Sequence, residues 1–213
     1  MKILFQGDSI TDGNRYKDKA LEWDKNHQIG HSYAYIVTGL LSLKHSDKNH
    51  IFINRGVAGN KTDDLLLRWQ DDCLDINPDI LIMLIGVNDV FFPLNEEEGF
   101  VSSRFEKNYR ELLTKIRQKN PDIKIILLEP FVYLNHIIGE VQGVEKSNME
   151  FVQRTVKTLA SEFEAKFIPL QKDFDKLAIN QSPEYWIWDG IHPTEAGHAL
   201  IGQKLINELN HIL

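Results

Sequence analysis

The sequence contains one cysteine, no run of five basic residues and no apolar stretch approaching 18 residues. Cys73 has no second cysteine for an internal disulfide, and no Cys/His pattern suggests structural zinc. A transmembrane helix needs a longer apolar run, and nucleic-acid binders usually carry basic stripes. With a formal charge of -7, the chain is expected to bind neither nucleic acid nor a metal, and not to insert stably into membranes.

What the chain does contain is typical of a globular protein. Its 213 residues are 42% hydrophobic and 26% charged, which favours one domain over residues 1–213. The apolar run at 3–5 follows Met1 almost directly and leaves no room for a signal peptide, so a cytoplasmic protein is expected. Cys73 shares a helical face with Leu66 and Trp69, which predicts a buried thiol.

Short apolar runs alternate with segments of helical periodicity along the whole chain. The run at 80–85 is apolar throughout, as expected of a central parallel strand covered on both faces. The alternation, with its short connections, predicts a single three-layer α/β domain built on a parallel sheet. Strands are expected at 3–5, 51–53, 80–85, 123–128 and 167–168, and helices at about 31–44, 62–76, 103–118, 145–165 and from 194 onward.

Details of two helices can also be predicted. In the helix expected at 31–44, apolar side chains recur at helical spacing at Tyr35, Leu40 and Leu43. Thr194 precedes the closing helix, where a hydroxyl side chain is a common N-cap.

Polar residues follow three of the expected strands. Ser9 and Asn88 come after the strands at 3–5 and 80–85, and the glycine-rich turn 56–60 follows the strand at 51–53. The carboxyl ends of parallel strands meet at one edge of a sheet, where ligands bind. Ser9 at this edge is either a reactive group or the N-cap of the next helix.

Near the C-terminus, Asp189 and His192 lie three residues apart. At this spacing the carboxylate can accept a hydrogen bond from Nδ1 of the imidazole, which leaves Nε2 free to act as a base. A base of this kind needs a nucleophile, and Ser9 is the candidate on the same sheet edge. The order serine, aspartate, histidine is one of several in which a catalytic triad arises.

Four motifs together resemble the SGNH hydrolases, the GDSL esterase/lipase superfamily. They occur in the order of that family and span nearly the whole chain. The resemblance implies a flavodoxin-like fold with a five-stranded parallel sheet, and a serine esterase that needs no cofactor. The motifs are Gly7-Asp8-Ser9-Ile10, Gly56-Val57-Ala58-Gly59-Asn60, Gly86-Val87-Asn88-Asp89 and Asp189-Gly190-Ile191-His192-Pro193.

The resemblance also implies a role for each matching residue. Ser9 would be the nucleophile, His192 the base and Asp189 the residue that orients the base. The backbone N–H groups of Ser9 and Gly59 and the side-chain amide of Asn88 would form the oxyanion hole. These are neutral donors, which suits the negative charge of a tetrahedral intermediate.

Four stretches resemble the bacterial intracellular acetylxylan and xylo-oligosaccharide esterases: Gly7 to Asp12, Arg68-Trp69, Ile85 to Val90 and Trp188-Asp189. This resemblance implies a short-chain, acetyl-type ester of a carbohydrate as substrate. Similar deacetylases often self-associate, so a homo-oligomer is possible. Phe91, Tyr133 and Trp188 could line the substrate site, although core packing is the alternative for each. The charged insert at 14–29 is longer than expected for those esterases and could form a lid.

Several alternatives remain open at this level. An arylesterase, thioesterase or lysophospholipase would require a deeper apolar channel, for which the space beneath the loop at 131–143 is the candidate. A non-catalytic, flavodoxin-like nucleotide-binding protein is the rival from another class, because the stretch from Gly56 to Thr62 partly resembles a phosphate loop. Ser32 lies in a motif similar to a nucleophile elbow, but the residues before it are too polar for a buried strand. Glu129 could shape the substrate site or face solvent.

Overall fold

The computed structural model describes residues 1–18, 23–95, 99–137 and 146–213. Its centre is a parallel sheet of five strands in the order β2-β1-β3-β4-β5. This is the flavodoxin-like order: β2 lies on one side of β1, and the later strands β3, β4 and β5 are added on its other side. The prediction of five parallel strands is confirmed. The strands are β1 (Lys2–Gly7), β2 (Ile51–Asn54), β3 (Ile80–Leu84), β4 (Lys124–Leu128) and β5 (Lys166–Ile168).

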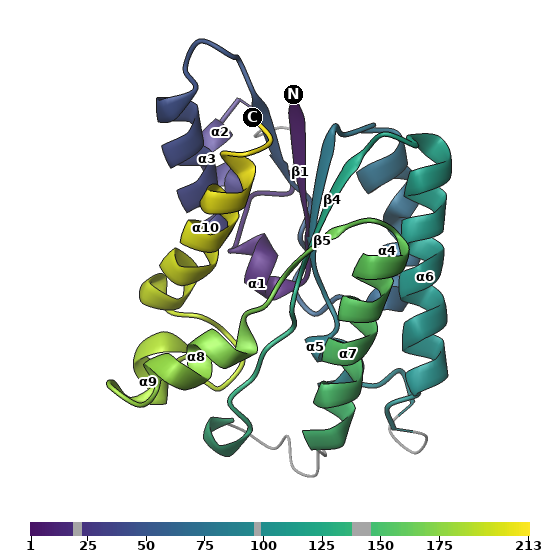
Figure 1. Ribbon diagram of the computed structural model, residues 1–213, viewed down its shortest axis with the longest axis vertical. Coiled ribbons are helices and arrows are strands. Elements are labelled where there is room, and N and C mark those ends of the chain that lie inside the picture. Colours follow the sequence, from purple (N-terminus) through teal and green to yellow (C-terminus); the bar gives the residue numbers. More distant parts are fainter. Residues whose placement is uncertain (19–22, 96–98, 138–145) are drawn as a thin grey trace.

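Helices cover both faces of this sheet (Figure 1). On one face lie α3 (Tyr33–Lys44) and α10 (Glu195–Leu209), which contact each other, and on the other lie α4 (Thr62–Trp69), α6 (Ser102–Lys119) and α7 (Lys146–Glu162). This arrangement confirms the three layers. The remaining elements are α1 (Ser9–Asp12), α2 (Lys25–Ile29), the π-helical turn η2 (Gln70–Leu74), α5 (Val87–Phe91), the 3-10 turn η3 (Leu134–His136), α8 (Gln171–Leu177) and α9 (Pro183–Trp186).

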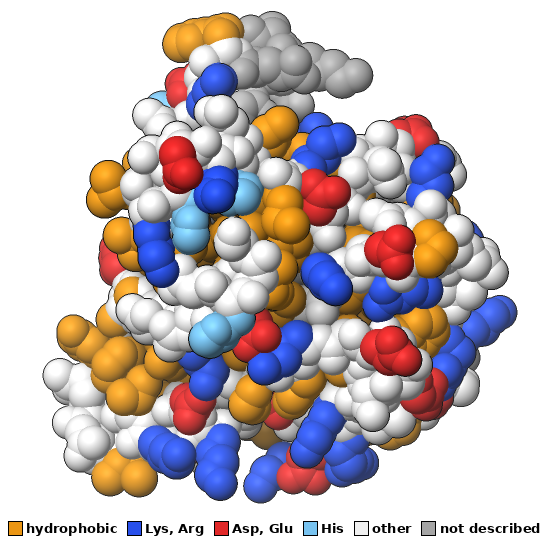
Figure 2. All heavy atoms as spheres, turned by 45° about the horizontal axis from the view of Figure 1, so that its top comes forward, with side chains coloured by type: hydrophobic (Ala, Val, Ile, Leu, Met, Phe, Trp, Pro, Cys, Tyr) orange, Lys and Arg blue, Asp and Glu red, His pale blue; other side chains and the backbone are white. Residues whose placement is uncertain are grey.

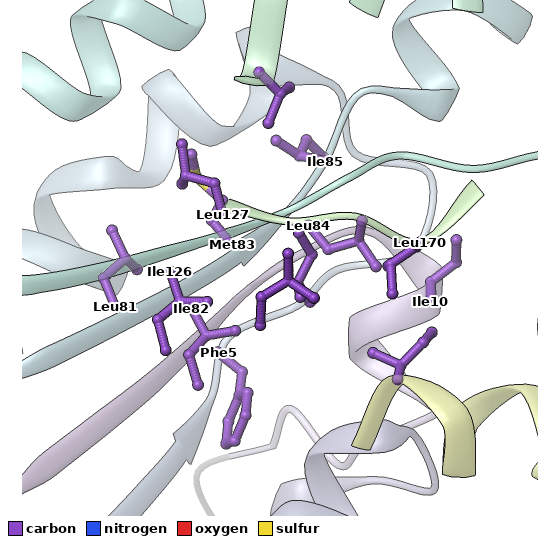
Figure 3. Packing of buried hydrophobic residues seen from close by; sticks show 14 of the residues in the cluster. Phe5, Ile10, Leu81, Ile82, Met83, Leu84, Ile85, Ile126, Leu127 and Leu170 are labelled. Atoms are coloured by element: carbon purple, nitrogen blue, oxygen red, sulfur yellow. The ribbon is translucent and has the colours of Figure 1, made fainter. Parts of the chain in front are cut away.

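The hydrophobic core lies between the sheet and the two helix layers. Every residue of β3 is buried, as predicted for the most apolar run of the chain. Figure 3 shows how β3 and β4 side chains pack beside Phe5 of β1, while Ile10 and Leu170 lie near one another toward one end of the cluster. Covering both faces of the sheet removes these side chains from water and stabilises the central strands.

The helices expected at 31–44 and 62–76 are present, with details that the spacing of apolar residues did not predict. The buried side of α3 is formed by Ala34, Val37 and Leu41, whereas Leu40 and Leu43 are exposed. Both sides of this helix are apolar, so helical spacing alone did not identify the inner one. The single helix expected over 62–76 ends as α4 at Trp69 and continues through η2. The predicted cap is confirmed, because the Thr194 hydroxyl accepts a hydrogen bond from the N–H of Gly197.

The surface mixes charges of both signs with scattered apolar side chains. Figure 2 views the molecule with the top of Figure 1 brought forward, and acidic and basic side chains are interspersed over that face. Among the helices the structure describes, none is both long and apolar enough to cross a membrane.

Candidate active site

Ser9 follows directly from the end of β1. A Cβ atom at Gly7 would lie 2.3 Å from the carbonyl oxygen of Leu84, so only glycine allows β1 and β3 to approach this closely. The N-cap of α1 is Asp8, whose carboxylate accepts a hydrogen bond of 3.0 Å from the N–H of Ile10. Asp8 and not Ser9 is therefore the helix cap, which leaves the serine hydroxyl available for other contacts.

The structure brings Ser9, His192 and Asp189 together at the carboxyl edge of the sheet. Ser9 Oγ lies 2.8 Å from His192 Nε2, and His192 Nδ1 lies 2.6 Å from Asp189 Oδ2. The second carboxylate oxygen of Asp189 accepts hydrogen bonds from the backbone N–H groups of Ile191 and His192, at 2.9 and 2.7 Å. A serine, a base and a group that orients the base are thus aligned, as acyl transfer requires.

The turn that carries Asp189 and His192 is fixed by its glycine. Gly190 has a φ of +88°, and a Cβ atom there would lie 2.9 Å from the backbone of His136. Partial burial raises the pKa of the Asp189 carboxyl, but the hydrogen bonds from His192 and Ile191 outweigh this effect and the net pKa is lowered. The carboxylate therefore remains charged opposite the imidazole.

Neutral hydrogen-bond donors lie on the two loops beside Ser9. Gly59 has a φ of +78° and is exposed, and among the described residues its N–H has no acceptor. Asn88 lies in α5, after the turn that follows β3, and is 4% exposed. One N–H of its side-chain amide donates to the carbonyl of Asn60 at 3.0 Å, so the other can donate to a ligand.

Two buried carboxyl groups lie behind these loops. Burial raises the pKa of Asp8 to about 7, and the charge of Asp89 acts in the same direction. Burial also raises the pKa of Asp89 to about 7, although hydrogen bonds from the Thr62 hydroxyl and N–H oppose the rise. Burial is thus the main cause of the raised pKa of both carboxyl groups.

The three aromatic residues predicted to line the substrate site occupy different environments. Phe91 is 6% exposed and belongs to the hydrophobic core. Tyr133 is 7% exposed, and its hydroxyl donates to the carbonyl of Phe174. Trp188 is 53% exposed, and its ring stacks on His192 with 5.9 Å between ring centroids. Phe91 therefore packs in the core, Tyr133 is mostly buried but also lines a cavity, and Trp188 is exposed beside His192.

Two residues discounted from the sequence have structural contacts. Ser32 is buried at the N-cap of α3, where its hydroxyl donates to the carbonyl of Thr11 at 2.8 Å. Cys73 is fully buried, as predicted, and burial raises the pKa of its thiol. Neither side chain is presented as a nucleophile.

Glu129 is neither a substrate residue nor a free surface carboxylate. Its side chain accepts hydrogen bonds of 2.7 and 2.8 Å from the backbone N–H groups of Leu170 and Gln171. These N–H groups lie at the start of α8 and lack partners within the helix. Glu129 therefore joins the end of β4 to α8.

The insert at 14–29 contains a second Asp–His pair. Asp24 Oδ2 lies 2.6 Å from His27 Nδ1, at the same three-residue spacing as the pair beside Ser9. The ring of His27 stacks on Tyr16, with 4.7 Å between ring centroids. The contacts of His27 with Asp24 and Tyr16 therefore connect two parts of the insert. The prediction of a lid also involves 19–22, which lie outside the described residues.

The described parts of the chain do not contain a cluster of three or more His, Cys, Asp or Glu side chains able to hold a metal ion. The site contains a serine hydroxyl, an imidazole paired with a carboxylate, and neutral N–H donors.

The chain resembles known proteins along most of its length. The model of the GDSL-like lipase/acylhydrolase family matches residues 5–200. An acetylxylan esterase of Geobacillus stearothermophilus is 30% identical, over 98% of this chain and 93% of that protein. A solved structure from Parabacteroides merdae, described as a GDSL-like lipase, has a TM-score of 0.87 at 31% identity and covers 97% of this chain and 94% of its own.

The crystal structure of the Geobacillus stearothermophilus acetylxylan esterase superimposes with a TM-score of 0.81 at 29% identity, over 97% of this chain and 93% of that one. Three other solved structures of that esterase are described as catalytic mutants, in which a serine, an aspartate or a histidine is replaced by alanine. Together with the family match over most of the chain, these likenesses show that the chain belongs to the GDSL-like lipase/acylhydrolase family and is a carboxylic ester hydrolase.

Proposed function

We propose that this chain removes acetyl groups from carbohydrate esters through a Ser-His-Asp mechanism with an acyl-enzyme intermediate. The observation that carries the proposal is the hydrogen bond of 2.8 Å between Ser9 Oγ and His192 Nε2, with Asp189 at 2.6 Å on the opposite side of the imidazole. A hydroxyl paired with an oriented neutral imidazole is the arrangement that activates serine as a nucleophile.

In the first half-reaction, Ser9 Oγ attacks the carbonyl carbon of the ester and its proton passes to His192 Nε2. The carbonyl oxygen gains negative charge and accepts hydrogen bonds from the N–H groups of Ser9 and Gly59 and from the Asn88 amide. The intermediate then collapses, the C–O bond to the alcohol breaks, and His192 gives its proton to the departing oxygen. Asp189 stabilises the imidazolium throughout.

In the second half-reaction, water attacks the acetyl-Ser9 ester and gives a proton to His192 Nε2. The second tetrahedral intermediate uses the same oxyanion donors. It collapses with cleavage of the C–O bond to Ser9 and releases acetic acid, which ionises to acetate in water. The proton on His192 returns to Ser9 Oγ, which regenerates the free enzyme. No cofactor enters either step.

The choice of a short acyl group is supported by the surroundings of the loop at 131–143, whose last residues, 138–143, are not among those described. A cavity of about 560 Å³ lies beside its described part, and its lining mixes polar side chains such as Gln153 and Gln171 with apolar ones such as Leu134 and Met149. A long acyl chain is stabilised most by a lining that is apolar throughout, and polar groups interrupt this one. The name of the acetylxylan esterase relative points to the same substrate class.

A nucleotide-binding function is less compatible with the same loops. The N–H and hydroxyl of Thr62 would be the donors of a phosphate loop, but both donate to the Asp89 carboxyl, at 3.2 and 2.5 Å. With both donors already bound to Asp89, neither is free to bind a phosphate.

The proposal is tested by hydrolysis of p-nitrophenyl esters from acetate to octanoate, in the presence of EDTA, followed by acetate release from acetylated xylo-oligosaccharides. We expect kcat/KM to be highest for acetate and to fall steeply with chain length. Ser9→Ala should lower kcat by a factor on the order of 10⁴ or more. A preference for octanoate would replace the deacetylase with a lipid or thioester hydrolase. Unchanged turnover in Ser9→Ala would exclude the serine mechanism.

A further inference from the structure

In the loop 56–60 the two neighbours of Gly59 make hydrogen bonds, whereas the Gly59 N–H has no acceptor in the part of the chain that the structure describes. The N–H of Ala58 donates to Asp12 Oδ2 at 3.0 Å. On the other side, Arg68 Nε donates to the side-chain oxygen of Asn60 at 2.7 Å. The N–H of Gly59 is the one proposed to bind the oxyanion, so its direction is set by the two residues that flank it.

Arg68 connects this loop to the nucleophile. Its Nη2 donates to the carbonyl oxygen of Gly7, two residues before Ser9, at 3.3 Å. Its Nη1 donates to the carbonyl of Arg55 at 2.8 Å and to Asp72 at 2.9 Å. The planar guanidinium offers five N–H donors in a fixed geometry, so one side chain bridges the turns that carry both backbone donors of the proposed oxyanion hole.

Asp12 connects the same two turns from the opposite side. It lies in α1, three residues after Ser9, and is 1% exposed. Lys17 Nζ lies 2.6 Å from the carboxylate oxygen that also accepts the Ala58 N–H. Its other oxygen accepts the backbone N–H of Arg15 at 3.2 Å. With these partners the buried carboxylate is compensated, and it ties α1 to the loop.

We propose that Arg68 and Asp12 are positioning residues that hold the N–H of Gly59 in register with the N–H of Ser9. This inference rests on the proposed serine mechanism and extends it to two residues that do not touch the substrate. Oxyanion donors are effective when they are already oriented before charge develops. A displacement of about 1 Å at a reacting centre can cost about 10²-fold in rate.

The pair of Arg68 and Asn60 allows a direct test by a double-mutant cycle on hydrolysis of p-nitrophenyl acetate. We expect Arg68→Ala and Asn60→Ala each to lower kcat by about 10- to 10²-fold, with KM within about twofold of the wild type. Because both substitutions break the same contact, the double variant should be no slower than Arg68→Ala. Arg68 does not act through the loop if the fold-losses in kcat of the two single variants multiply in the double variant. A raised KM with unchanged kcat would lead to the same conclusion.

Arg55→Ala is the matched control, because Arg55 Nε lies 3.4 Å from the same Asp72 and the substitution removes the same charge. Its side chain does not make any described hydrogen bond to the loop, and wild-type kcat is expected. Asn60→Ala removes a small, partly exposed side chain, so a reduced kcat in this variant carries the conclusion even if Arg68→Ala does not fold, as judged by circular dichroism.

Asp12 is tested by comparing two substitutions. Asn retains an oxygen that can accept the Ala58 N–H, whereas Ala does not, so Asp12→Asn should keep kcat within about threefold and Asp12→Ala should lower it by about 10-fold or more. Equal kcat values for the two variants would overturn the role of Asp12. If wild type and Ser9→Ala both fail to hydrolyse any ester, the proposed function itself is wrong. Full kcat in Asn60→Ala and Arg68→Ala, with an inactive Ser9→Ala, would remove only the positioning role.

Discussion

Asp189 holds His192 at two places, the ring and the backbone. One carboxylate oxygen lies 2.6 Å from Nδ1, and the other accepts the His192 backbone N–H at 2.7 Å. The first contact fixes the tautomer, with the proton on Nδ1 and Nε2 free for the Ser9 hydroxyl. The second contact fixes the backbone of the turn that carries His192. The effects of the two contacts can be separated by mutation.

Asp189→Asn is expected to lower kcat by about 10⁴-fold with little loss of stability. An asparagine oxygen can still accept the backbone N–H groups, but the amide presents N–H donors to the imidazole and favours the wrong tautomer. Steady-state kinetics on p-nitrophenyl acetate and a thermal melt measure the two effects. Activity within tenfold of the wild type would mean that Asp189 serves the turn alone, and Asp189→Ala, which removes both contacts, supplies the comparison.

Asn88→Ala is expected to lower kcat by about 10²–10³-fold. Its amide is 4% exposed and already uses one N–H on the carbonyl of Asn60. The remaining N–H is the one available to the oxyanion. Asn88→Asp preserves the size of the side chain but places a carboxyl where negative charge develops, and should be at least as slow as Asn88→Ala. Near-normal turnover in Asn88→Ala would remove this residue from the oxyanion hole.

Trp188→Ala is expected to raise KM for acetylated xylo-oligosaccharides by about 3- to 10-fold, which corresponds to the loss of one aromatic packing contact. The ring is 53% exposed and lies at 21° to the plane of His192, so one edge of the site is an aromatic face. The effect on p-nitrophenyl acetate should be smaller, because that substrate lacks a sugar ring. Trp188→Phe should restore most of the affinity. An equal rise in KM for both substrates would exclude recognition of the sugar.

The sequence was sufficient to predict the sheet because its strands are short, continuous apolar runs. It also placed Ser9, Asn88 and the loop 56–60 at one edge, since the carboxyl ends of parallel strands coincide there. The meeting of Ser9 with His192, 183 residues away, followed from family resemblance together with the base chemistry of the Asp–His spacing.

Other features depended on contacts that no local pattern encodes. The bonds from Arg68 to Gly7 and Asn60 join three separate segments, and nothing in the spacing of these residues distinguishes Arg68 from a solvated arginine. Phe91 and Trp188 are both aromatic residues near motifs, yet one is 6% and the other 53% exposed. Their difference is decided by tertiary packing and not by residue type.

Two glycines should respond to alanine in opposite directions. At Gly7 the added Cβ would lie 2.3 Å from the Leu84 carbonyl oxygen, so Gly7→Ala should lower Tm strongly or prevent folding. At Gly39, inside α3, nothing lies within 4 Å of the added atom. Gly39→Ala should stabilise the fold by about 0.5–1 kcal/mol, through better helix propensity. Thermal melts of both variants test the packing, and a stable Gly7→Ala protein would contradict the close approach of β1 and β3.

The buried carboxyl of Asp8 should make the fold less stable as pH rises. Burial raises its pKa to about 7, whereas the unfolded chain has an ordinary carboxyl pKa of about 3.9. Between these values the unfolded state has released the proton that the native state keeps, so the free energy of unfolding falls with rising pH, and above about 7 the loss is complete. Asp89, with a pKa of about 7, acts in the same sense, while His198, whose pKa burial lowers to about 4, opposes it at acidic pH.

Asp8→Asn isolates this contribution, because its oxygen can still accept the Ile10 N–H while the titrating group is removed. The Tm of Asp8→Asn minus the Tm of the wild type should therefore be more positive at pH 8 than at pH 5. Groups common to both proteins cancel in this difference. A difference that does not change with pH would show that Asp8 has an ordinary pKa in the folded protein. In that case a charged carboxylate, and not a neutral acid, would lie directly behind the nucleophile.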